Sequence, residues 1–92
     1  MLRIWGGGWY ERDALYQACY RYGIMIWHDF MFACAPYPDH LDGFRTEVMR
    51  EADYQTKRLQ RHASIVLWCG SNENIWGFRD WWNGQTKAGA QI

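Results

Sequence analysis

Three short apolar runs separated by helical stretches constrain the fold of this chain more than any other feature of its sequence. In Ile24–Trp27 and Ile65–Leu67 the apolar side chains occupy consecutive positions, so both faces of each run require burial. Strands of that kind are typical of parallel sheets that are covered on both sides. The sequence therefore predicts parallel strands near Leu2–Trp5, Ile24–Asp29 and Ile65–Cys69.

Two amphipathic helices are predicted between these strands. The first begins near Glu11, carries apolar side chains at helical spacing as far as Tyr22, and is ended by Gly23. The second begins near Leu41, after a loop that contains both prolines, and extends toward Ser64 with its charged residues mostly on the solvent side. The order strand, helix, strand, helix, strand describes two successive right-handed crossover units. This order predicts an α/β fold of three parallel strands with intervening helices.

Length and charge limit the classes of function. Ninety-two residues suffice for one small domain, whereas a (β/α)₈ barrel needs about 250, so we expect the chain to be a piece of something larger. A net charge of zero without a basic stripe gives no reason to expect nucleic acid or an anionic membrane as a partner. No apolar run approaches the roughly 20 residues of a membrane span. No signal peptide is visible in this segment, which leaves the compartment open and slightly favours the cytoplasm.

The three cysteines stand far apart in the sequence, at Cys19, Cys34 and Cys69. This odd number at wide spacing is typical of small buried hydrophobic residues and not of a disulfide framework. No pair of cysteines or histidines has the close spacing that anchors a zinc site. We therefore expect unpaired thiols, no metal and no cofactor.

Each predicted strand ends in residues that suit a functional site, because the carboxyl ends of parallel strands surround the crevice in which such proteins work. Trp5 precedes three glycines, Asp29 ends the second strand, and Asn72 and Glu73 follow the third. A carboxylate beside an asparagine and several tryptophans fits sugar chemistry, since tryptophan rings stack on sugars and glycoside hydrolysis uses two carboxyl groups. Alternatively, Glu73 is an N-terminal capping residue of a following helix.

Three blocks of the sequence carry a family resemblance. They are LRIWGGGWYE, GIMIWHDFMFACAPYP and EADYQTKRLQRHASIVLWCGSNEN, and in order and spacing they resemble the catalytic barrel of the β-mannosidases of glycoside hydrolase family 2. The resemblance covers residues 2 to about 76 and implies that residues 1–92 are part of a glycoside hydrolase (β/α)₈ (TIM) barrel domain, with its strands two to four. The related β-galactosidases and β-glucuronidases differ after the first of these strands, which favours mannose as the sugar.

The resemblance also implies roles for individual residues. Glu73 matches the general acid/base, and Asn72 matches the partner of the sugar 2-hydroxyl. Arg3 matches the arginine that orients the nucleophilic carboxylate, and Trp5 would line the mannosyl subsite; a surface arginine and an ordinary packing tryptophan are the alternatives. Asp29 either contacts sugar hydroxyls or is a structural carboxylate that holds a loop. The nucleophile of the family is a glutamate on the seventh strand, which this chain does not contain.

These implications define the function that we expect. The chain would carry the acid/base strand of a retaining, exo-acting β-mannosidase, which hydrolyses terminal non-reducing β-D-mannose from oligosaccharides or glycans. Its partners would be such a glycan and the rest of the parent enzyme chain, and the segment alone would be inactive. The alternative is a truncated, non-catalytic α/β fragment that binds carbohydrate or associates with itself. Three further tryptophans near the end of the chain are left without a role; they are Trp76, Trp81 and Trp82.

Overall fold

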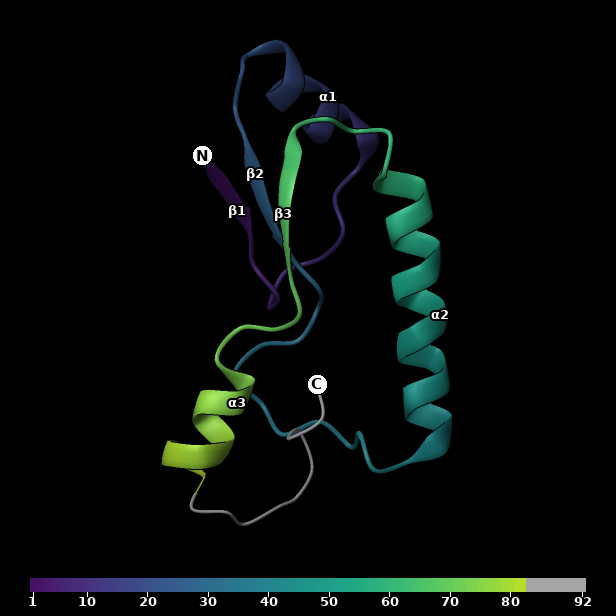
Figure 1. Cartoon of the computed structure of the whole chain (residues 1–92), viewed down its shortest axis with the longest axis vertical. Coiled ribbons are helices and arrows are strands. Elements are labelled where there is room, and N and C mark those ends of the chain that lie inside the picture. Colours follow the sequence, from purple (N-terminus) through teal and green to yellow (C-terminus); the bar gives the residue numbers. More distant parts are fainter. Residues whose placement is uncertain (83–92) are drawn as a thin grey trace.

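The computed structural model describes residues 1–82 and contains the predicted alternation of strands and helices (Figure 1). The elements are β1 (Leu2–Ile4), α1 (Asp13–Arg21), β2 (Ile26–Asp29), α2 (Asp42–Leu59) and β3 (Ile65–Cys69). A helical turn, α3 (Asn74–Trp76), and a π-helical segment, η1 (Gly77–Trp81), follow β3. A helix after Glu73 was only an alternative in the sequence analysis, and η1 was not predicted.

The three strands form one sheet in the order β1-β2-β3, and both neighbouring pairs are parallel. This confirms the prediction of a parallel α/β unit. Ile4 lies opposite His28, and His28 lies opposite Trp68. The three carboxyl ends therefore meet at one edge of the sheet, where α3 also lies (Figure 1).

The helix ends follow local sequence signals, with one difference from the prediction. The first helix, α1, ends where expected because Gly23 adopts a φ of 67°, a conformation that glycine takes without steric cost. The second helix, α2, ends at Leu59 and not near Ser64. Ser64 is buried, and its hydroxyl donates a hydrogen bond to the carbonyl oxygen of Tyr16 at 3.0 Å. This bond ties the turn before β3 to α1.

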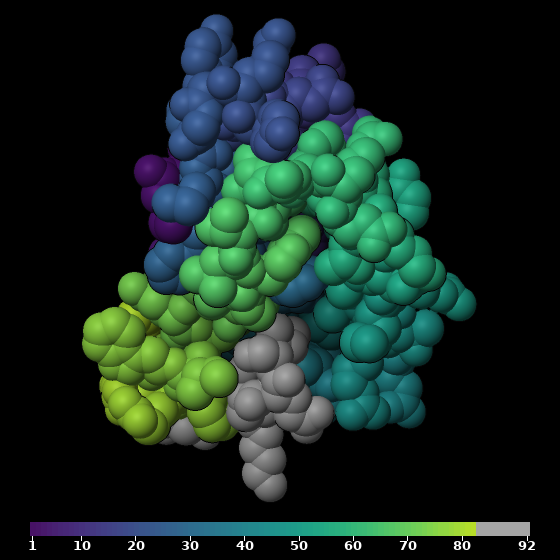
Figure 2. All heavy atoms as spheres, turned by 45° about the horizontal axis from the view of Figure 1, so that its top comes forward, coloured from purple at the N-terminus to yellow at the C-terminus, as the bar shows by residue number. Residues whose placement is uncertain are grey.

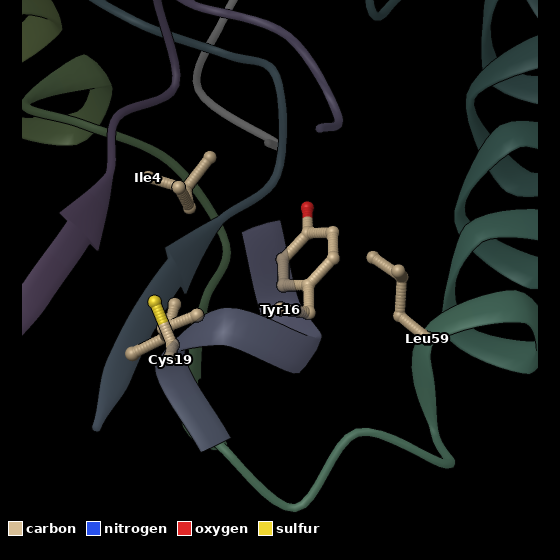
Figure 3. Packing of buried hydrophobic residues seen from close by; sticks show 5 residues of the cluster. Ile4, Tyr16, Cys19 and Leu59 are labelled. Carbon is tan, nitrogen blue, oxygen red and sulfur yellow. The ribbon is translucent and has the colours of Figure 1, made fainter. Parts of the chain in front are cut away.

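The hydrophobic core lies between one face of the sheet and the two long helices (Figure 3). Ile4 and Ile26 come from the sheet, Tyr16 and Cys19 from α1, and Leu59 from the last turn of α2. Each fully buried aliphatic side chain of this size stabilises the fold by roughly 1.5–3 kcal/mol. The core thus fixes α1 and the C-terminal end of α2 on the same face of the sheet.

An irregularity in the pairing of β2 with β3 changes which side chains of β3 reach the core. Ile26 pairs with Ile65, but its neighbour Trp27 pairs with Leu67, so one residue of β3 has no partner at this point. Both Ile65 and Trp68 consequently contact the core cluster although they are three positions apart. Simple alternation along a strand does not predict this arrangement.

The opposite face of the sheet carries exposed apolar side chains. Val66 is 51% exposed and Leu67 is 46% exposed. Within residues 1–82, β1 and β3 are the outer strands of the sheet.

A hollow of about 280 Å³ lies between α2 and the strand ends. It opens between the green of β3 and the teal of α2 in Figure 2. Its lining is mainly apolar and includes Phe30, Phe44 and Val48. No helix in the described part of the chain is long and apolar enough to cross a membrane.

Candidate active site

A bidentate ion pair connects the ends of β1 and β2. The Arg3 Nε donates to Asp29 Oδ1 at 3.2 Å, and the Arg3 Nη2 donates to Asp29 Oδ2 at 2.7 Å. The same Oδ2 accepts the backbone N–H of Gly6 at 3.0 Å, and the Asp29 side chain is fully buried. Asp29 therefore has the environment expected of the structural carboxylate that was the alternative for this residue.

Arg3 extends this ion pair to the third strand end. Its Nη2 also donates to Asn72 Oδ1, at 2.8 Å. Because a guanidinium group only donates hydrogen bonds, the oxygen of the Asn72 amide must face Arg3, and its Nδ2 must point the other way. That Nδ2 lies 3.2 Å from the Cys34 Sγ, and the Cys34 Sγ lies 3.5 Å from Glu73 Oε2.

Arg3 thus fixes the direction of the hydrogen bond from Asn72 to Cys34 and, through it, of the one from Cys34 to Glu73. Asn72 donates to the sulfur of Cys34, which leaves the thiol hydrogen free to be donated to the carboxylate of Glu73. We call the series Asp29, Arg3, Asn72, Cys34 and Glu73 the polar chain. The structure brings four of the five predicted site residues together in it.

Backbone hydrogen bonds hold the loop after β2 against the segment after β3. The N–H of Asn72 donates to the carbonyl of Phe32 at 2.8 Å, and the N–H of Cys34 donates to the carbonyl of Asn72 at 3.0 Å. These bonds form an isolated parallel bridge between Ala33 and Asn72. Beyond it, the Asn74 side chain donates to the carbonyl of Ala35 at 3.1 Å. The pairing of β2 with β3 therefore resumes beyond the strands and fixes Asn72 and its neighbours.

Glu73 has a left-handed backbone conformation with φ 60° and an exposed side chain. It occupies the position before α3, yet its side chain makes no capping hydrogen bond. A capping role is therefore not what its geometry provides. Among the non-glycine residues that the structure describes, only Cys34 shares a positive φ, at 50°. Such conformations cost of order 1–3 kcal/mol each and are concentrated at functional sites.

Sequence reasoning missed Cys34. It was predicted to be a small buried residue together with the other two cysteines, but the structure places it at the surface. The prediction is correct for Cys19, which lies in the core, while Cys69 is half-buried. All three thiols are unpaired. Nothing in the spacing of the sequence signals a left-handed cysteine. Its positive φ occurs next to the bridge between Ala33 and Asn72, which joins segments far apart in the sequence.

The glycines after Trp5 permit two close approaches. A Cβ atom on Gly7 would lie 2.0 Å from the ring of Trp5, and a Cβ atom on Gly6 would lie 2.5 Å from the carbonyl oxygen of Phe32. The chain therefore runs directly against the Trp5 ring on one side and against the loop after β2 on the other. Trp5 itself remains 48% exposed and lines, together with Arg3, a surface hollow of about 190 Å³.

His28 lies buried beneath this site and takes no part in its surface. Its Nδ1 is 2.8 Å from the backbone carbonyl of Asp29, so this nitrogen carries the proton and Nε2 accepts the Tyr16 hydroxyl at 2.8 Å. Burial lowers the pKa of His28, and its ring stacks on Trp68 with 4.7 Å between centroids. The neutral imidazole thus forms a rigid support for the end of β2.

Among residues 1–82, no group of three or more histidine, cysteine or acidic side chains is arranged to hold a metal ion. The chemistry available at the site is that of the polar chain itself. It offers one exposed carboxylate, a fixed amide, and the second Nη nitrogen of Arg3, which forms no hydrogen bond within the described residues.

Comparison with known proteins gives a consistent assignment. No family model matches the chain. The β-mannosidase of Bos taurus is 55% identical over 73 residues, which is 79% of this chain and 8% of the relative. Beta-mannosidase B of Emericella nidulans is 47% identical over 74 residues, 80% of this chain and 9% of the relative. The chain thus spans less than a tenth of the length of these curated relatives.

Comparison of the fold with solved structures also finds a β-mannosidase. The crystal structure of a β-D-mannosidase from Dictyoglomus thermophilum superposes with a TM-score of 0.87 at 50% sequence identity, covering 96% of this chain and 11% of that structure. The three parallel strands and their helices therefore match a small part of a β-mannosidase structure. The chain is a homologue of the β-mannosidases, corresponding to about a tenth of their length.

Proposed function

We propose that this chain is the acid/base segment of a retaining, exo-acting β-mannosidase, and that its strands are strands two to four of a (β/α)₈ barrel. The substrate class is an oligosaccharide or glycan with a terminal, non-reducing β-D-mannose. Homology to β-mannosidases over four-fifths of the chain supports the sugar and the reaction. The meeting of three parallel strand ends at one edge supports the barrel, since barrel enzymes place their chemistry there.

In this proposal Glu73 performs two proton transfers. As an acid it protonates the glycosidic oxygen that departs, while a carboxylate outside this chain attacks the anomeric carbon and forms a glycosyl-enzyme. As a base it then removes a proton from the water that hydrolyses this intermediate, which returns Glu73 to its protonated form. The exposed side chain of Glu73 suits a group that must reach a substrate.

The neighbouring residues have supporting roles. The second N–H of the Asn72 amide is free to donate to the sugar 2-hydroxyl, because only one is directed at Cys34. Arg3 uses Nε and Nη2 on Asp29 and Asn72, and its Nη1 is left to orient the nucleophilic carboxylate. Trp5 would stack against the mannosyl ring, for which its half-exposed ring is suited. Asp29 acts through Arg3 and is not a sugar ligand.

The observation that carries the proposal is the conformation of Glu73. An exposed carboxylate is held on a strained, left-handed backbone without serving as a helix cap, at the end of a polar chain that spans three strands. A residue kept for stability alone would be expected to avoid that conformation, since its cost must be offset elsewhere.

The test replaces Glu73 with glutamine in the full-length enzyme that carries this segment. Turnover of a mannoside with a poor leaving group should fall by about 10²- to 10⁴-fold, because general acid catalysis contributes that much. An activated aryl mannoside should lose less in the first step, and external azide should restore part of the second step by attacking the intermediate without a base. Equal small losses on both substrates, with no rescue by azide, would contradict the proposal.

A second candidate is a non-catalytic α/β fragment that associates with itself. The exposed Val66 and Leu67 on the uncovered face of the sheet favour it, because an outer strand with apolar side chains is prone to pair with another chain. Sedimentation of the 92-residue chain alone distinguishes the two. A discrete dimer that binds mannose-containing glycans supports the fragment, whereas aggregation without binding supports a segment that needs the rest of an enzyme.

A further inference from the structure

We propose that Cys34 is a positioning residue for Glu73, and that it presents one chosen oxygen of the Glu73 carboxyl group to the substrate. The inference rests on the proposed function, since it assigns Cys34 a part in the same proton transfers. It is carried by the contact between the Cys34 Sγ and Glu73 Oε2 at 3.5 Å. Within residues 1–82, the Glu73 carboxylate has no other hydrogen-bond partner.

The direction of the contact follows from the polar chain. Arg3 can only donate, so the Asn72 oxygen faces Arg3 and the Asn72 amide nitrogen faces the sulfur at 3.2 Å. The sulfur is thereby used as an acceptor, and its own hydrogen points to Glu73 Oε2. In a protonated carboxyl group the carbonyl oxygen accepts hydrogen bonds better than the hydroxyl oxygen does, so a donor at one oxygen favours protonation of the other. The exchangeable proton of Glu73 is therefore placed on Oε1, the oxygen left for the leaving group.

The backbone adds a second constraint on the same pair. Cys34 and Glu73 both have a positive φ, and the two segments are joined by the hydrogen bonds on either side of Ala33. Those bonds keep the thiol within reach of the carboxylate. The role inferred for Cys34 is exerted through Glu73, which makes it a positioning residue and not a catalytic one.

Substitution of Cys34 by glycine separates the thiol from the backbone. Glycine adopts the left-handed conformation without steric cost, so the Cys34→Gly variant removes the thiol without straining the loop and adds only some entropy to the unfolded chain. Cys34→Ser restores a group that can accept from Asn72 and donate to Glu73. Cys69→Ala is the matched control, because Cys69 is a neighbouring thiol whose hydrogen goes to the Ser71 carbonyl and not to the polar chain.

The measurement is kcat and KM of the full-length enzyme on an unactivated mannoside and on an activated aryl mannoside, with thermal unfolding as a check on folding. We expect Cys34→Gly to lower kcat on the unactivated substrate by about 3- to 10-fold, the range given by the loss of one neutral hydrogen bond. KM and the activated substrate should change little. Cys34→Ser should recover most of the loss, and Cys69→Ala should leave the ratio between the substrates unchanged.

Each outcome has a distinct meaning when Glu73→Gln is measured alongside. If Glu73→Gln shows the acid/base pattern while Cys34→Gly matches the wild type on both substrates, the inference on Cys34 is wrong and the proposed function stands. If Glu73→Gln shows no acid/base pattern, the proposed function itself fails. A loss in Cys34→Gly that is equal on both substrates, or that serine does not reduce, assigns Cys34 to the fold alone and also overturns the inference.

Discussion

The guanidinium of Arg3 and the carboxylate of Asp29 form a bidentate ion pair in which the carboxylate is fully buried and the arginine side chain is 37% exposed. Asp29 is therefore shielded from solvent, whereas Arg3 still reaches the surface. Asp29 connects β2 to Arg3 of β1 and accepts the N–H of Gly6. Arg3 also donates a hydrogen bond to Asn72. The same ion pair therefore joins two strands of the sheet and orients a residue of the candidate site.

Replacement of Asp29 by asparagine should destabilise the protein that carries this segment by about 3 kcal/mol, the lower end of what breaking a buried ion pair costs. The lower end applies because Arg3 is partly exposed and regains water. An amide also turns an N–H group toward donors on Arg3 or Gly6, which cannot accept it. Denaturant unfolding of the two proteins measures the difference.

The matched control for this substitution lies on α2. Asp53 pairs with Lys57 at 2.8 Å, but both side chains are well exposed. Exposed pairs of this kind contribute little, so Asp53→Asn should leave the unfolding curve almost unchanged. Equal effects of the two substitutions would show that the Arg3–Asp29 pair is no more than a surface contact.

The glycines after Trp5 should respond differently to alanine. Gly6→Ala places a methyl group 2.5 Å from the backbone oxygen of Phe32, so the loop after β2 must move and the protein should lose stability. Gly7→Ala places it 2.0 Å from the Trp5 ring, which can swing away. We therefore expect Gly7→Ala to keep the unfolding temperature nearer to that of the wild type but to raise KM for mannosides, if Trp5 forms the sugar subsite.

Gly43 provides the control for both variants. It lies in the first turn of α2, and a methyl group there would meet no atom within 4 Å. Gly43→Ala should leave the stability unchanged or raise it slightly, because the propensity gain is smaller in the first turn than in the middle of a helix, and it should leave KM unchanged. Kinetics and thermal unfolding of the three variants together test the assignment. An unchanged KM in Gly7→Ala would remove Trp5 from the sugar site.

The buried His28 predicts a loss of stability in mild acid. Burial holds its pKa below the ordinary value of 6.5, so the unfolded chain takes up a proton at a higher pH than the folded chain does. The contribution of His28 to the free energy of unfolding is therefore complete above about pH 6.5 and falls as the pH drops below it, by at most about 1.4 kcal/mol per pH unit. The fall ends when the folded state also binds the proton.

Thermal unfolding of the wild type and of His28→Asn between pH 5 and pH 8, roughly the range in which histidine titrates, isolates this contribution. Asparagine keeps a donor near the Nδ1 position and has no titration of its own. The variant should be less stable at every pH, because it leaves space beside Tyr16, but the gap should narrow in acid. A gap that is constant across the range would mean that His28 titrates normally.

Much of the fold was predictable because it depends on patterns that extend over many residues. The order of strands and helices, their parallel pairing and the end of α1 at Gly23 all follow from apolar periodicity and glycine conformation. The bulge in β3 was not predictable in the same way. It places Ile65 and Trp68 on one face through a single unpaired residue, and no periodic pattern records such an event.

The sequence predicted most residues of the candidate site but not the hydrogen bonds and burial that link them. Asn72 and Glu73 were identified by their place at a strand end and by resemblance, Arg3 was identified by resemblance alone, and the structure brings the three together. The burial of Asp29 depends on a partner 26 positions away, and the exposure of Cys34 depends on a bridge to a segment 38 positions away. Contacts over such separations leave no local signal in a single sequence.

The strain at Glu73 yields the last prediction. Its φ of 60° costs an L-residue of order 1–3 kcal/mol, and its side chain makes no capping bond that would offset this cost. Glycine removes the strain, although it adds some entropy to the unfolded chain. Glu73→Gly should therefore leave the unfolding temperature of the full-length enzyme unchanged or raise it, while turnover of unactivated mannosides is lost.

The control variant Glu73→Gln keeps the strain and should be no more stable than the wild type. If Glu73 instead capped the start of α3, Glu73→Gly would lose a few tenths of a kcal/mol and would not gain stability, and both variants would keep their activity per folded molecule. Unfolding and turnover measured on the same two variants decide between these readings of one residue.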